Sequence, residues 1–270
     1  MRTSILSRSR GLSEAAEHQM RKWALRMESQ QRLEEEAKGT PEQLIHSYIA
    51  ISREAGVDAG EIAKAVASRI GWKVFDRELL DYMVDHYHWS RVALDYVDER
   101  TVSWFHETFG KWLDEQLVSQ AEFVHRLGKT VLLAAQHEST VFVGRGAQFI
   151  LPRELGFAVR VIAPKKHRVQ RIMERDQCSR REAEKFVDET DKGRSDFVER
   201  YFHGDVADPH QYDLVINLEH LPREVAVELI VNEAARRHER SAAETSKRMS
   251  ARRDTHRLDE SAGKVTRDYA

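Results

Sequence analysis

Short β-prone runs that alternate with helical segments constrain the fold of this chain more than any other feature. Five apolar runs lie at residues 48–51, 73–75, 140–143, 158–163 and 213–216. The segments between them carry apolar residues three to four positions apart, which is the spacing of an amphipathic helix. Strands that alternate with helices predict an α/β protein, a three-layer parallel sheet with helices on both faces.

The helical segments are defined by this spacing and by the residues that end them. Ile62, Val66 and Ile70 are four apart and give one buried stripe, and Gly71 follows as a stop signal. The predicted helices cover residues 61–70, a segment after Asp76, and residues 90–138, 165–176, 179–200 and 223–237.

The two ends of the chain differ in charge from its middle. Residues 1–40 carry 8 Lys and Arg against 6 Asp and Glu, and residues 236–270 carry 10 against 6. With a total of −2, residues 41–235 therefore have a net charge of −8. An acidic body argues against nucleic-acid binding by the folded part. We expect an N-terminal helical extension at 1–40, a folded domain at 41–238 and a disordered polar tail at 239–270.

The N-terminal extension is predicted to form a helix from Ser13 to about Lys38. Its apolar stripe is thin, so the helix is expected to lie on the body, on a protein partner or on a second copy of the chain. Residues 1–12 lack the apolar core of a secretory signal, and no run approaches the 18 apolar residues of a membrane span. A cytoplasmic protein without membrane attachment is therefore expected.

The composition also bears on metal and redox chemistry. A single cysteine, Cys178, leaves no disulfide within the chain and no Cys-based zinc site. Thirteen histidines are present, but His86 and His88 are two apart, which places them on different sides of a helix. No metal site built from protein ligands is expected.

Ligands of a parallel sheet bind beyond the carboxyl ends of its strands. Three polar segments begin where an apolar run ends: residues 52–60, residues 144–148 and the stretch after Ala163. The first has a strand–loop–helix layout, in which free amides and the helix dipole favour an anion such as phosphate.

The loop at residues 52–60 does not match the Walker pattern G-x-x-x-x-G-K-[ST]. Only three residues separate Gly56 from Gly60, and Glu61 stands where the pattern has lysine. From the loop alone, an ordinary turn between strand and helix stays open as the alternative.

A collinear set of motifs over about residues 47–235 resembles a known family. The motifs are Ile51-Ser52-Arg53 with Glu61-Ile62-Ala63, Phe75-Asp76-Arg77-Glu78-Leu79-Leu80, Asp98-Glu99, Val143-Gly144-Arg145-Gly146-Ala147-Gln148, Arg160-Val161-Ile162-Ala163-Pro164 with Arg168 and Arg171, Glu189-Thr190-Asp191-Lys192-Gly193-Arg194, and Tyr212-Asp213-Leu214-Val215-Ile216-Asn217. In order and spacing they resemble the cytidylate kinase-like family, relatives of the bacterial cytidylate kinases.

The resemblance implies a P-loop fold like that of the nucleoside monophosphate kinases, with a mobile lid at about residues 165–200. It implies a phosphotransferase that moves phosphate from ATP to CMP or dCMP, with ATP and Mg²⁺ as cofactors and a nucleotide as substrate. The ATP phosphates would lie on the loop residues, which are Ser52, Gly56, Val57, Asp58, Ala59, Gly60 and Glu61.

The resemblance also assigns roles to charged residues around the loop. Arg53, Arg168 and Arg194 would neutralise the phosphates, because guanidinium groups pair with phosphate oxygens. Asp191 would orient Arg194 or a metal-bound water. The acceptor nucleotide would be held by Asp76, Arg77 and Arg145.

Simpler interpretations of these residues stay open. Asp76 also fits a plain helix N-cap, and Arg145 a solvated residue of a tight turn. Arg168, Arg171 and Arg175 share one helical face and also fit a solvated, salt-bridged helix.

The loop departs from the family pattern in two ways: it gains a negative charge at Asp58 and lacks the arginine of the pattern. Members show Ser-Gly-Gly-Arg where this chain has Val57-Asp58-Ala59-Gly60. A carboxylate at Asp58 repels phosphate by about 4 kcal/mol per charge at about 4 Å and an effective dielectric near 20, and the lost glycine limits close approach of the backbone. Arg53 is a candidate for the missing cation, and Mg²⁺ could use Asp58 as a ligand. A catalytically inactive nucleotide-sensing or scaffolding module is therefore the alternative to the phosphotransferase.

Overall fold

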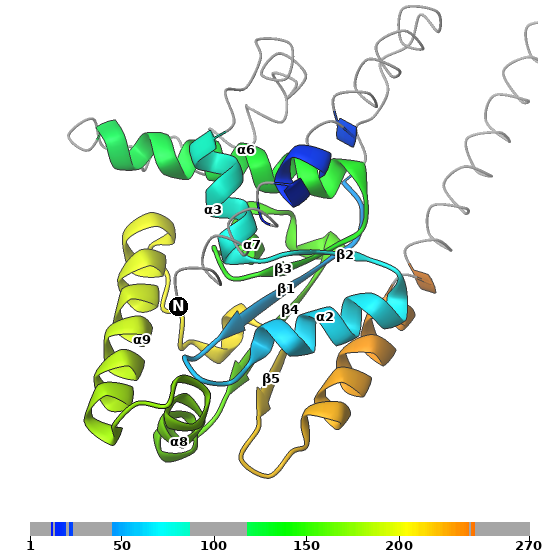
Figure 1. The fold of residues 1–270 in the computed structure, drawn as a ribbon. Helices are drawn as coiled ribbons and strands as arrows, with labels where there is room; N and C mark the ends of the chain where they lie inside the picture. Colours follow the sequence, from blue (N-terminus) through cyan, green and yellow to red (C-terminus); the bar gives the residue numbers. More distant parts are fainter. Residues whose placement is uncertain are drawn as a thin grey trace, which may run out of the picture.

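The protein forms a single parallel sheet of five strands, covered by helices on both faces (Figure 1). The computed structural model describes residues 12, 14–19, 22–23, 45–86, 118–237 and 239–240. The strands are β1 (Tyr48–Arg53), β2 (Lys73–Phe75), β3 (Thr140–Val143), β4 (Gly156–Ile162) and β5 (Leu214–Asn217), in the order β2-β3-β1-β4-β5. The predicted α/β class and parallel sheet are confirmed.

The central strand β1 places the sequence segment that most concerns function in the middle of the sheet. It pairs with β3 through Ile49 and Val141 and with β4 through Ser52 and Arg160. Its side chains from Tyr48 to Ser52 are buried, as expected for a strand covered on both faces. β1 runs two residues further than the predicted strand and ends at Arg53.

The helices follow the predicted order. They are α2 (Ala59–Ile70), α3 (Arg77–His86), α6 (Val118–His137), α7 (Ala147–Ile150), α8 (Lys165–Asp176), α9 (Arg180–Phe202) and a helix at residues 223–237, with short 3-10 helices η2 (Arg153–Leu155) and η3 (Pro209–Gln211). α2 begins two residues earlier than predicted. Of the helix predicted over 90–138, residues 118–137 are helical, and residues 87–117 lie outside the described part.

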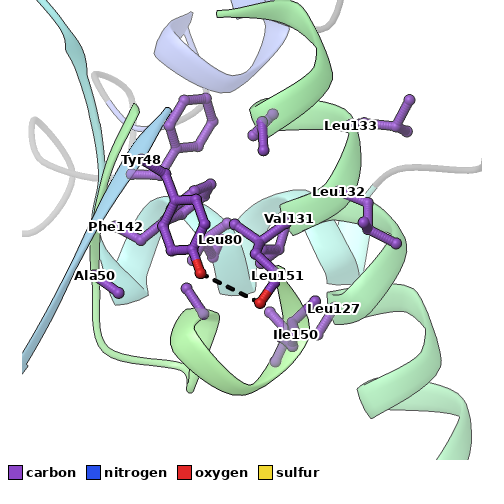
Figure 2. Packing of buried hydrophobic residues seen from close by; sticks show 14 of the residues in the cluster. Tyr48, Ala50, Leu80, Leu127, Val131, Leu132, Leu133, Phe142, Ile150 and Leu151 are labelled. Atoms are coloured by element: carbon purple, nitrogen blue, oxygen red, sulfur yellow. Dashed lines mark hydrogen bonds between the residues drawn. The ribbon is translucent and has the colours of Figure 1, made fainter. Parts of the chain in front are cut away.

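Two hydrophobic clusters hold the layers together, one on each face of the sheet. On one face, Ile62 and Val66 of α2 pack with Ile230 of the helix at 223–237. On the other face, Leu80 of α3 and Leu132 of α6 pack around Phe142 and Tyr48 (Figure 2). The Tyr48 hydroxyl donates to the Leu151 carbonyl at 3.2 Å, which satisfies this buried polar group.

The N-terminal helix packs on the body. Residues 14–19 and 22–23 are helical, and Trp23 is only 1% exposed. Its indole stacks on Phe75 and His137, with ring centroids 5.9 and 5.4 Å apart. Gln19 donates to Glu138 at 2.8 Å. The remainder of the helix predicted over 13–38 and the tail beyond residue 240 lie outside the described residues.

Among the described helices, none is both long and apolar enough to cross a bilayer.

Candidate phosphate-binding site

A cavity of about 320 Å³ lies where β1 and β3 end, and α9 forms its opposite wall. This position is the one expected for a ligand of a parallel sheet. Its wall carries four arginines, Arg53, Arg77, Arg145 and Arg194, and a single carboxylate, Glu189. The other lining residues are Ser52, Gly144, Gly146, Gln148, Thr190, Gly193, Phe197, Val198 and Val206.

Arg53 is the cation set deepest in this arrangement. Its guanidinium lies against Gly144, where an added Cβ would come 1.8 Å from Arg53 Nη1, so a larger residue there would displace the guanidinium. The positive φ of Gly144 (81°) also favours glycine. Burial lowers the pKa of Arg53 to about 9, and the like charges of Arg194, Arg77 and Arg145 add to the effect. Arg53 forms no ion pair with any described carboxylate, so its charge is left for a ligand to neutralise.

Arg145 is held in a different way. Its left-handed backbone (φ 56°) turns the chain after β3, and its Nε donates to Asp81 of α3 at 2.6 Å, while Nη2 contacts the second carboxylate oxygen. The guanidinium also lies over the rings of Phe123 and Phe197, at 5.5 and 5.2 Å from their centroids. Arg145 therefore lines the cavity with its charge already paired.

The start of α3 contains the other two predicted acceptor residues. Asp76 Oδ1 accepts a hydrogen bond from the Leu79 amide at 2.9 Å, so Asp76 caps α3 and does not line the cavity. Arg77 lines the cavity and is 3.5 Å from Asp81, with about half of its side chain exposed. Of these two, the structure brings only Arg77 to the cavity wall.

The loop at residues 54–60 joins β1 to α2 and is named here the phosphate loop, after the role expected from the sequence. Within the described part of the chain, the backbone N–H groups of Gly56 to Gly60 donate to no protein acceptor. Asp58 begins the helix without a side-chain cap, and its carbonyl accepts from Glu61 and Ile62 at 3.0 and 3.3 Å. Unpaired amides at a helix N-terminus form an anion site, which a chain of phosphate groups fits.

The negative charge of Asp58 is partly neutralised by a nearby arginine. Its carboxylate is paired with Arg171 of α8. The residue adopts the left-handed conformation (φ 49°) that the family glycine would adopt, which aspartate tolerates better than most residues. The sequence predicts an uncompensated charge here, and the structure corrects this by supplying Arg171, a cation 113 positions away.

The helices of the expected lid, α8 and α9, pack against each other (Figure 1). Besides Arg171, they contact the phosphate loop through Asp191 and Arg168. Asp191 of α9 accepts from the Ala55 amide at 2.7 Å and from Arg168 Nη1 at 2.5 Å. Arg168, nearly buried, also donates to the Ala163 carbonyl at 2.8 Å and lies 3.2 Å from Glu54. Arg168 is thus committed to protein partners and does not line the cavity.

Arg194, one turn beyond Asp191 on α9, also links the lid to the end of β1, and it lines the cavity. Its Nη1 donates to the Arg53 carbonyl at 3.0 Å and lies 3.7 Å from Asp191. Burial lowers the pKa of Arg194, although Asp191 opposes the shift. Arg194 therefore joins the lid to the end of β1 and still presents its charge to the cavity.

A second cavity of about 270 Å³ lies on the α8 side of the phosphate loop. It is lined by Val57, Ala163, His167, Gln170, Arg171 and Leu218. The loop therefore separates two spaces, one beside α8 and one beside α9. Glu61, the last predicted loop residue, is exposed and paired with Lys64 at 3.0 Å.

The structure thus brings Ser52, Arg53, Arg77, Arg145 and Arg194 to one cavity, and puts Val57 in the other. Asp76, Arg168 and Asp191 lie around the first cavity as supports. Sequence reasoning missed Phe197 and Arg160 near the site. An arginine inside an apolar strand was the available signal for Arg160.

A parallel sheet with a loop of free amides after its central strand and a helical lid over that loop defines a P-loop kinase-like protein. The model of the cytidylate kinase-like family matches residues 48–220, and the chain belongs to this family. No curated protein matches the chain.

A solved structure resembles the chain in fold, and two others match it with TM-scores below 0.5. An uncharacterized protein from Eubacterium ventriosum ATCC 27560 is 23% identical, with a TM-score of 0.57 over 70% of this chain and 98% of that chain. Shikimate kinase from Bacteroides thetaiotaomicron is 15% identical, covering 68% of this chain and 95% of that chain, with a TM-score of 0.34. A gluconokinase from Sinorhizobium meliloti 1021 is 13% identical, covering 76% and 98%, with a TM-score of 0.38.

Proposed function

We propose that this protein transfers a phosphoryl group from ATP to a nucleoside monophosphate, with CMP or dCMP as acceptor. The observation that carries the proposal is the arginine-lined cavity, above all Arg53, a buried cation that pairs with no described carboxylate. A buried charge without a partner is costly, and a phosphate at this point offsets the cost.

The donor side is the phosphate loop. The amides of Gly56 to Gly60 and the dipole of α2 would hold the phosphates of ATP, and the cavity beside α8 is a space for the rest of the nucleotide. Mg²⁺ bound to the phosphates would neutralise part of their charge. Arg53 and Arg194 supply the cations that the loop itself lacks.

The acceptor side is the cavity between the end of β3 and α9. Arg77 and Arg145 would bind the acceptor phosphate, and the Phe197 ring and the Gln148 amide offer stacking and hydrogen bonds to a base. Phosphoryl transfer asks the protein mainly for alignment and for positive charge on the equatorial oxygens. The attacking atom is an oxygen of the acceptor phosphate, so no protein base is required.

A second candidate function is nucleotide binding without turnover. It is favoured by the state of Arg145 and Arg168, which are paired with Asp81 and Asp191 in the structure. Arg168 does not line the arginine-rich cavity, so its pair with Asp191 must open before its guanidinium reaches a phosphate there, whereas Arg145 already lines the cavity with its charge paired. A protein that binds a nucleotide without transferring phosphate does not need these arginine–carboxylate pairs to open.

The test measures ADP released from ATP with CMP, dCMP, UMP or AMP as acceptor, beside calorimetric titration with ATP. Turnover with CMP or dCMP that falls at least a hundredfold in Arg145→Ala supports the proposal. Arg180→Ala, an exposed α9 arginine paired with Glu184, is the matched control and should retain activity. Because Arg145→Ala leaves Asp81 without its partner, thermal unfolding is followed in parallel.

Two results contradict the proposal. ATP binding without turnover on any acceptor assigns the protein to nucleotide sensing. Absence of both ATP and CMP binding in a folded protein removes both candidate functions and leaves scaffolding.

A further inference from the structure

Arg160 is a buried arginine in the middle of strand β4, only 8% exposed. Its register partner on β1 is Ser52, which lines the arginine-rich cavity. Arg160 does not line the cavity itself. It lies one hydrogen bond behind the wall, since its Nη1 donates to Ser52 Oγ at 3.1 Å.

The contacts of Arg160 connect it to residues of the cavity wall but do not neutralise the charge of its guanidinium. The guanidinium lies over the Tyr212 ring, 5.7 Å from its centroid. The Tyr212 hydroxyl is 3.2 Å from Ser52 Oγ and 2.9 Å from the Val206 carbonyl, and both Ser52 and Val206 line the cavity. No described carboxylate lies within ion-pair distance of Arg160. Its partners are thus a hydroxyl and an aromatic face, which orient a cation but carry no opposite charge.

A buried and uncompensated cation normally destabilises a fold, and replacing such a group with an apolar residue of similar size is often stabilising. The cost is larger here because other cations are close. The charge of Arg160 is one of those that lower the pKa of Arg194, after burial itself. Packing alone gives no reason for an arginine at this point of an apolar strand.

We propose that Arg160 is a positioning residue of the phosphate cavity: it fixes Ser52 through the Nη1–Oγ hydrogen bond and adds positive potential behind the wall for an anionic ligand. The inference rests on the proposed function only in that the cavity binds a phosphate group. It does not require turnover.

The test combines affinity with stability in the full-length protein. Arg160→Met keeps the length and apolar body of the side chain and removes its charge, and Arg160→Lys keeps the charge but not the planar fork. Calorimetry measures affinity for CMP and for inorganic pyrophosphate, a probe without a base. Thermal unfolding is measured on the same samples.

Arg237→Met is the matched control. Arg237 also lies over an aromatic ring, 4.7 Å from the centroid of Phe157 at the start of β4, but it is paired with Asp213 and Glu233. We expect Arg160→Met to bind both probes about tenfold more weakly with an unchanged or higher unfolding temperature, and Arg160→Lys to recover most of the affinity. Arg237→Met should show the reverse, with lower stability and unchanged affinity.

The inference is overturned if Arg160→Met lowers the unfolding temperature and leaves both affinities unchanged, because Arg160 is then only structural. That result is compatible with full CMP kinase activity of the wild-type protein. Conversely, pyrophosphate binding that depends on Arg160 in a protein that transfers no phosphate supports the inference and contradicts the phosphotransferase.

Discussion

At the scale of single residues, Asp58 shows how a departure from a family pattern is accommodated. The position keeps the left-handed backbone, and the carboxylate finds a cation on α8. Neither feature restores what the glycine and arginine of the family pattern would give, which is a loop without a carboxylate and with its own cation. Asp58 thus fits the fold, and under the proposed function its charge would weaken the attraction for phosphate.

Removing this charge should strengthen ATP binding. Asp58→Asn keeps a residue that tolerates the left-handed conformation and releases Arg171 toward the phosphates. We expect ATP affinity to rise about tenfold, which is about 1.4 kcal/mol. The half-exposed pair contributes at most about 1 kcal/mol to stability. Calorimetry checks the affinity, and Asp176→Asn, which removes an exposed partner of Arg175, is the control. Weaker ATP binding in Asp58→Asn would show that the carboxylate assists the site.

The depressed pKa of Arg53 gives a pH dependence with a defined sign. Its guanidinium must be charged to bind phosphate, and its pKa is about 9 in the folded protein. Affinity for sulfate, an anion whose own charge does not change in this range, should therefore be constant near neutral pH and decrease as the pH rises through about 9. A bound anion favours the charged form, so binding takes up protons in that range. Calorimetry at several pH values in buffers of different ionisation enthalpy measures both effects. Arg53→Met should bind more weakly and lose this dependence, and an unchanged profile would exclude Arg53 as the titrating group.

At the scale of elements, the sequence predicted the strands and helices well and their side-chain partners poorly. Period and stop signals are local, so β3 and α8 were placed at their observed residues. The partners Arg171 of Asp58 and Asp81 of Arg145 are 113 and 64 positions away. Such pairs depend on how α3 and α8 pack, and the hydrophobic periodicity of the sequence gives no information about that packing. The strand-end rule still found Arg53 and Arg145, because that rule follows from topology.

The connection between the lid and the phosphate loop is the element-level feature that most invites a test. Asp191 joins α9 to Ala55 and to the nearly buried Arg168. Asp191→Asn removes the charge that pairs with Arg168. We expect stability to fall by about 1–3 kcal/mol and amide exchange at Ala55 and along α9 to accelerate. Hydrogen-exchange mass spectrometry measures the exchange. Asp196→Asn, which breaks an exposed pair with Lys192 on the same helix, should change little. Equal protection in Asp191→Asn and wild type would mean that α9 is held by apolar packing alone.

At the scale of the whole molecule, the structure shows where positive charge is concentrated on an acidic body. The body has a net charge of −8 over residues 41–235, yet four of its arginines line one cavity, at the ends of β1 and β3, at the start of α3 and on α9. A net acidic body with this arginine-lined cavity favours small anions at the cavity over polyanions elsewhere on the body. The hydrophobic clusters on the two faces of the sheet support the strands that end at this cavity, and one of them includes Trp23 of the N-terminal helix.

The N-terminal helix should therefore contribute to the stability of the whole domain. Trp23 is buried and stacks on Phe75 and His137, so Trp23→Ala leaves a large cavity beside β2 and α6. We expect the free energy of unfolding to fall by about 3–5 kcal/mol, with a smaller loss in Trp23→Phe. Chemical denaturation followed by circular dichroism measures both. Trp23 does not line the arginine cavity, so pyrophosphate affinity of the folded variants should match that of the wild type. A loss below about 1 kcal/mol would mean that the helix is an appendage. A stability loss accompanied by a loss of anion binding would mean that the N-terminal helix also shapes the cavity, through β2 and the start of α3.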